Sequence, residues 1–146
     1  ANLILPFEVA NFASAMRTAA AQILVQRDGP ALQPGPRRYT RSWIRDGAIM
    51  AAALLRVGER DAALGFVRWY AGFQADDGRV PCCVDRSGPD WLVEHDSHGE
   101  FVWIVLECFR FTGDRAFLEA LWPAVRRALA CLDGLRAQRS GAAYAD

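Results

Sequence analysis

The sequence predicts an all-α protein built from tandem antiparallel helical hairpins. Apolar residues recur at helical spacing over most of the 146 residues, and the alternation typical of strands is nearly absent. Two short turns, around Gly58 and Gly113, lie 55 positions apart, and each follows an apolar segment and precedes an amphipathic one. A repeated unit of this length is typical of a stacked or circular array of hairpins.

Five helices are expected, with boundaries good to about two to four residues, at residues 7–26, 46–57, 60–73, 97–112 and 115–136. The second and fourth are apolar almost all round and should be buried on every side, whereas the third and fifth have one polar face and should be peripheral. The turn glycines can end a helix in the left-handed conformation, and an acidic residue then begins the next helix. Pro123 can split or kink the last helix.

The two buried helices should run in the same direction, because each is followed by an antiparallel partner. Their N-terminal ends should therefore lie at one common end of the array, together with the long loops 27–45 and 74–96. Any chemistry carried by these loops is expected to meet there.

The composition is that of one globular domain, with 52% hydrophobic and 23% charged residues. Its seventeen basic residues, all arginine, are scattered among seventeen acidic ones, so no basic face for a nucleic acid is expected. No apolar run approaches the roughly 18 residues of a membrane-spanning helix. Phosphate-binding glycine loops and dinucleotide fingerprints are absent, so no cofactor is expected.

The chain has four cysteines, namely Cys82, Cys83, Cys108 and Cys131. Their spacing is not that of a disulfide framework, so free buried thiols are predicted. A zinc site can be drawn from the adjacent pair together with His95 and His98. It lacks the C-x-x-C pair that tetrahedral thiolate sites usually show, and no metal is expected.

The first long loop gathers groups suited to sugar recognition. Trp43 offers an aromatic face for the apolar side of a pyranose, while Arg41, Arg45 and Asp46 can bond vicinal hydroxyls. In the alternative interpretation, Asp46 is an N-terminal helix acid paired with Arg45, and Trp43 only fills the core.

The second long loop repeats this pattern with Trp91, Glu94 and Asp96 ahead of an apolar helix. Burial beside that helix can raise a carboxyl pKa, as a general acid requires. The alternative is that Asp96 or Ser97 caps the helix, Ser97 pairing with Glu100 in a capping box.

The two histidines of the chain, at positions 95 and 98, lie at the end of this loop and in the first turn of the expected helix after it. Two histidines three residues apart, without a third ligand, are weak evidence for a metal. His95 and His98 are therefore expected to form hydrogen bonds at the rim of the cleft.

Three stretches resemble the six-hairpin glycosidases, which include glucoamylases and the glucosidase domains of glycogen-debranching enzymes. They are the W-x-R-D element within residues 41–47, the loop 94–99, and the run T-G-D-x-x-F-L-x-x-x-W-P at 112–123. The resemblance covers most of residues 36–138. It implies that the helices form part of an (α/α)6 toroid.

The resemblance also implies site residues. Arg45 and Asp46 correspond to the pair that binds hydroxyls of the terminal sugar. The general acid of the family lies in a segment resembling D-L-W-E-E, and the nearest match, 90–94, gives Glu94. The match lacks one of the paired glutamates and displaces the tryptophan, so Asp96 remains a second candidate.

A complete barrel of this family has twelve helices, so the chain is expected to be a fragment of a single domain. Its expected partners are an oligo- or polysaccharide and the rest of the barrel, whose late hairpin supplies the catalytic base. An exposed apolar surface should remain where further hairpins pack. The predicted activity is glycoside hydrolysis of the inverting, glucoamylase-like type. The alternatives are a non-catalytic helical-repeat module that binds glycan or protein, and a phosphorylase or lyase on the same scaffold.

Overall fold

The computed structural model describes residues 10–36 and 39–139, and its helices confirm the predicted all-α hairpin fold. Residues 7–9 of the first expected helix lie outside the described residues. The helices are α1 (Ala10–Val25), α2 (Ile44–Arg56), α3 (Arg60–Ala71), α4 (Asp96–Thr112) and α5 (Arg115–Arg139). Among the described residues, no helix combines the length and the apolar character needed to cross a membrane.

The two glycine turns have the geometry that the sequence predicts. Gly113 follows α4 in the left-handed conformation, at φ 68°, and Gly58 has φ 90° after α2. Asp114 then accepts a hydrogen bond from the backbone N–H of Phe117 at 2.9 Å, so its side chain caps the start of α5. Each turn therefore reverses the chain within a few residues.

Helix α5 is continuous across Pro123, so of the two expected effects of this proline a split of the helix does not occur. The ring of Pro123 lies on an exposed part of the helix. A proline removes one backbone hydrogen bond, and the packing of α5 along α4 holds the helix together on both sides of it.

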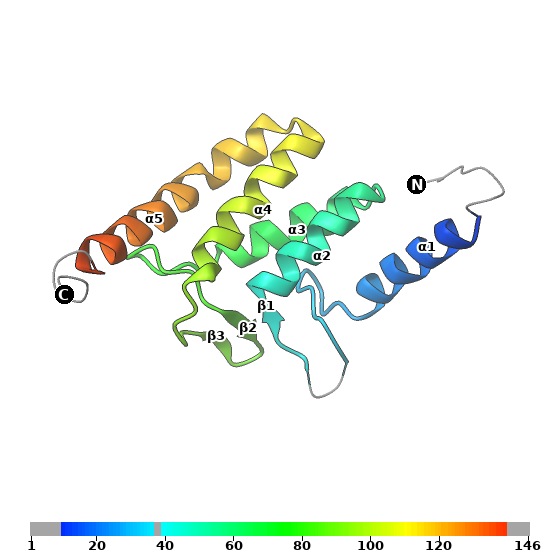
Figure 1. The fold of residues 1–146 in the computed structure, drawn as a ribbon, viewed down its shortest axis with the longest axis horizontal. Coiled ribbons are helices and arrows are strands. Elements are labelled where there is room, and N and C mark those ends of the chain that lie inside the picture. The colour runs from blue at the N-terminus through cyan, green and yellow to red at the C-terminus, as the bar shows by residue number, and fades with distance from the viewer. Residues whose placement is uncertain (1–9, 37–38, 140–146) are drawn as a thin grey trace.

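The helices pack as two hairpins side by side (Figure 1). Helix α2 packs against α3, α4 against α5, and α2 also lies along α4. Figure 1 shows α2 and α4 running in the same direction, each antiparallel to the helix that follows it. The core between them contains Leu54, Phe66, Tyr70, Ile104 and Phe117. The parallel arrangement of the two inner helices was predicted.

Helix α2 approaches α3 closely at Gly47. A Cβ built on this glycine would lie 2.2 Å from Cζ of Phe66, which is fully buried. Any larger residue would displace the ring, so the absence of a side chain at this position allows the two helices to pack closely.

Helices α2 and α4 are not buried on every side, contrary to expectation. Both have an exposed face that runs along the helix, with Ile49 59% and Leu106 46% exposed. The further members of these faces are Arg45, Ala53 and Arg56 on α2, and Gly99, Trp103 and Arg110 on α4. Their centres are apolar, which agrees with the expected apolar surface.

A small antiparallel sheet that the sequence did not predict lies at the end where α2 and α4 begin (Figure 1). It contains β1 (Ser42–Trp43), β2 (Cys83–Asp85) and β3 (Gly88–Asp90), in the order β1-β2-β3. Trp43 pairs with Cys83, which pairs on its other side with Asp90. The sheet thus joins the two long loops directly.

Candidate functional site

Arg45, in the first turn of α2, joins the starts of both inner helices. Its Nη2 lies 2.5 Å from Oε2 of Glu94, and its Nε lies 2.6 Å from Oδ2 of Asp96. The Asp96 carboxylate, with a smaller contribution from Glu94, raises the pKa of Arg45. The two loops therefore meet at one charged cluster, as predicted from helix direction.

The pKa of Asp96 is lowered, not raised as a general acid requires. The hydrogen bond from Arg45 is the main cause, and it outweighs the effect of burial. Asp96 therefore carries a negative charge at neutral pH, which suits it to accept hydrogen bonds.

Glu100 is a member of this cluster that sequence reasoning treated only as a capping residue. Burial and the nearby negative charge of Asp96 raise the pKa of Glu100. Its position four residues after Asp96 places both side chains on one side of α4. This spacing was the signal in the sequence that could have identified it.

The capping interpretation of Asp96 and Ser97 is not supported. The residue at the N-cap of α4 is His95, and no side-chain hydrogen bond caps the helix there. Ser97 is buried in the first turn, and its Oγ has no hydrogen-bond partner among the described residues. Since Ser97 lies inside the helix, it cannot form the predicted capping box with Glu100.

The pairing of Arg45 with Asp46, the alternative that the sequence left open, does not occur. Arg45 turns toward α4, and the Asp46 carboxylate has no ion-pair partner among the described residues. Asp46 is partly exposed in the first turn of α2, where the helix dipole favours a negative charge.

Trp43 is only partly buried. Its ring stacks on Tyr39, with centroids 6.2 Å apart and planes 16° from parallel. The buried Nε1 of Trp43 has no hydrogen-bond partner among the described residues. Arg41, by contrast, is held by the sheet: its Nε lies 3.2 Å from Asp85 and its Nη1 lies 2.8 Å from Asp90.

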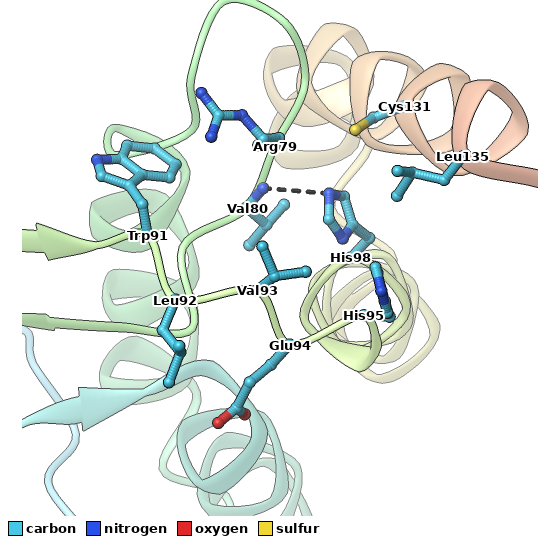
Figure 2. Close-up of a pocket in the computed structure, with 10 residues that line it drawn as sticks. All are labelled: Arg79, Val80, Trp91, Leu92, Val93, Glu94, His95, His98, Cys131 and Leu135. Carbon is cyan, nitrogen blue, oxygen red and sulfur yellow. Dashed lines mark hydrogen bonds between the residues drawn. The ribbon is translucent and has the colours of Figure 1, made fainter. Parts of the chain in front are cut away.

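A hollow of about 100 Å³ lies beside the cluster, between the second loop, the start of α4 and the end of α5 (Figure 2). The guanidinium of Arg79 lies 5.2 Å from the ring centroid of Trp91, which is 39% exposed. The lining residues are Arg79, Val80, Trp91, Leu92, Val93, Glu94, His95, His98, Cys131 and Leu135. Figure 2 shows the carboxylate of Glu94 pointing away from His98, toward α2.

The two histidines differ in environment. His95 is exposed, whereas His98 is 5% exposed and does not reach the rim as expected. Its Nε2 accepts a hydrogen bond from the backbone N–H of Val80 at 3.4 Å (Figure 2). Burial lowers the pKa of His98, so the ring is neutral and supports the loop at Val80.

The cysteines are free, as predicted; Cys82, Cys83 and Cys108 are buried, and Cys131 is partly exposed. The zinc site drawn from both histidines is not assembled among the described residues. The structure instead brings Asp90 together with Cys82 and Cys83, their potential ligand atoms all lying within 4.8 Å of one another.

Comparisons with known proteins relate this chain to glycosidases. A protein of Methanocaldococcus jannaschii named as an uncharacterized glycosyl hydrolase is 30% identical over 101 residues, 68% of this chain and 16% of that protein. Three structures of substituted glycosidases, one in complex with glucose, each match with a TM-score of 0.69 and 22% identity. They cover 89% of this chain and 42% of each glycosidase chain, so their fold is shared over that part. No family model matches.

Proposed function

We propose that this chain is part of the catalytic domain of a glycoside hydrolase, and that the common end of α2 and α4 forms part of its saccharide cleft. The observation that carries this proposal is the contact of Arg45 with Glu94 and Asp96, which gathers hydrogen-bonding groups from both hairpins. The similarity to proteins named as glycosidases, in sequence and in fold, supports it.

Each group has a role in this proposal. Asp46 and Arg45 bind sugar hydroxyls, because a carboxylate and a guanidinium form strong charge-assisted hydrogen bonds. Trp43 and Trp91 offer aromatic faces to the pyranose, while His95 and Arg41 lie at the margin. His98 acts indirectly, through Val80.

Glu94 is the proposed general acid, which protonates the leaving oxygen while a second carboxylate activates water. Asp96 is the weaker candidate, because its lowered pKa keeps it ionised. It would hold Arg45 in position and accept a hydroxyl hydrogen bond.

The domain is proposed to be an (α/α)6 barrel of glucoamylase-like type, to which this chain contributes its five helices. The chain spans 42% of the length of the similar glycosidase structures. The apolar exposed faces of α2 and α4 support this proposal, because Ile49, Trp103 and Leu106 would pack against further hairpins. The second catalytic carboxylate is proposed to come from those hairpins.

Two substitutions in the full-length protein test the proposal. Asp46→Asn should weaken saccharide binding about tenfold or more, because a hydrogen bond to a charged group contributes about 1.5–3 kcal/mol. It should change stability by only about 0.3–1 kcal/mol. Glu94→Gln should lower kcat about 10²- to 10⁴-fold and leave ground-state binding nearly intact.

Binding is measured by calorimetry, turnover on a panel of oligosaccharides and aryl glycosides, and stability by thermal denaturation. Glu119→Gln, on the exposed surface of α5, is the matched control and should change none of these. A loss of turnover in Glu100→Gln but not in Glu94→Gln would move the acid to Glu100. Unchanged turnover and binding in all the variants would exclude this loop end as the site and favour a structural role.

A further inference from the structure

The side chains of Cys82, Cys83 and Asp90 form a cluster on the small sheet that the proposed hydrolysis does not use. The two sulfur atoms lie 3.9 Å apart, and both cysteines are almost fully buried. Asp90 is the register partner of Cys83 on β3, and its side chain is 35% exposed. The cluster is therefore closed on the sulfur side and open to solvent beside the carboxylate.

The separation of the sulfurs matches two ligands on one tetrahedral ion. A zinc–thiolate bond is about 2.3 Å long, and two such bonds at the tetrahedral angle place their sulfurs about 3.8 Å apart. A disulfide would need about 2.05 Å. The separation of the two sulfurs therefore suits ligation of one shared ion.

The convergence of the sulfurs depends on the backbone at this point. Successive side chains of a regular strand point to opposite faces. Cys82 lies in a bend of the backbone directly before the first residue of β2, so it does not have regular strand geometry. Adjacent cysteines can therefore point to the same place without C-x-x-C spacing.

A cationic group already lies against the cluster. Nη1 of Arg41 is 2.8 Å from Oδ2 of Asp90 and 3.6 Å from Sγ of Cys83. Arg41 is about half exposed, and its Nε also pairs with Asp85 at 3.2 Å. It can move toward Asp85 and solvent when a metal ion approaches Asp90.

We propose that Cys82, Cys83 and Asp90 bind one thiophilic divalent cation of the zinc type, through both sulfurs and the carboxylate, with water as the fourth ligand. Both thiols release a proton to solvent when they bind the ion, and no electron is transferred. Since Trp43 pairs with Cys83, the ion would brace the strand that leads into Arg45.

Cobalt(II) titration of the reduced, metal-free full-length protein tests this inference without any measurement of activity. Wild-type protein should bind cobalt with a thiolate-to-cobalt charge-transfer band in the near ultraviolet, which zinc then abolishes. Cys82→Ser and Cys83→Ser should each weaken the band and lower the affinity about tenfold or more. Asp90→Asn should lower the affinity but keep the band, because both thiolates remain.

Cys131→Ser is the matched control, because this partly exposed cysteine lies outside the cluster, and it should behave as wild type. A wild-type protein without the band, or serine variants with the wild-type band and affinity, would overturn the proposal. If circular dichroism shows that a serine variant is unfolded, the Asp90→Asn variant provides the test instead. A cobalt affinity of Asp90→Asn equal to that of wild type would then overturn the proposal.

Discussion

Gly78 should be one of the positions least tolerant of a side chain, because its backbone conformation and its close contact with α5 both disfavour a Cβ atom. It has φ 91°, and a residue with a Cβ pays about 1–2 kcal/mol in the left-handed region. A Cβ at this position would also lie 2.2 Å from the backbone carbonyl oxygen of Arg127 on α5. Relief of that overlap must move backbone, at a typical cost of about 1–3 kcal/mol.

We therefore expect Gly78→Ala to destabilise the protein by about 2–5 kcal/mol, the sum of the two costs. Gly88→Ala is the matched control, because Gly88 has φ 114° but no atom within 4 Å of a built Cβ. It should cost only the conformational part, about 1–2 kcal/mol. Urea denaturation of both variants measures the difference.

If the two alanine variants lowered the free energy of unfolding equally, the close approach of Gly78 to Arg127 would contribute nothing, and the reasoning would be refuted. Hydrogen exchange provides a second measurement. The loop 74–80 is fastened to α5 by Gln74, whose Nε2 donates to the carbonyl of Ala124 at 3.0 Å. Gly78→Ala should accelerate exchange in this loop, whereas Gly88→Ala should not.

Two further predictions concern buried ionisable groups. The folded pKa of His98 is below its unfolded value, so its contribution to stability is present above about pH 6.5 and is lost as pH falls. His98→Gln should remove this loss, whereas His95→Gln should only reduce it, because burial is the larger cause of the lowered pKa and the charge of His95 the smaller one. Urea midpoints between about pH 5 and 8 measure both effects. Arg56→Met should lower the stability of the protein, because it weakens the pairing of the buried Glu107. The loss should be at most about 1–3 kcal/mol, since solvent screens the half-exposed guanidinium and reduces its contribution. Arg136→Met, which removes an exposed pair with Asp133, should stay within about 0.5 kcal/mol by chemical denaturation.

Helix positions and directions could be predicted because they depend on local patterns. The apolar period and the two glycine turns were enough to place α2 to α5 within a few residues. The small sheet could not be predicted, because strands of two or three residues show no alternation. The pairing of β1 with β2 also joins positions about forty residues apart, such as Ser42 and Val84.

The meeting of the two long loops at one end could be predicted, whereas the contacts between their side chains could not. Helix direction was enough to bring Arg45 near Glu94 and Asp96. The sequence could not show that one guanidinium would contact both carboxylates and thereby lower the pKa of Asp96. The burial of His98 likewise depends on the position of Val80 in a loop without local periodicity.

Helices α2 and α4 are connected by ion pairs at both ends, and the two connections have the same sequence offset. Arg45 bonds Asp96 near the N-terminal ends and Arg56 bonds Glu107 near the C-terminal ends, each over 51 positions. Because both ion pairs join residues 51 positions apart, they hold the two parallel helices at the same axial position relative to each other. A shift by one helical turn, about 5.4 Å, would break both connections at once. The axial alignment that places Glu94 and Asp96 beside Arg45 is therefore also maintained from the opposite end of the helices, far from the proposed cleft.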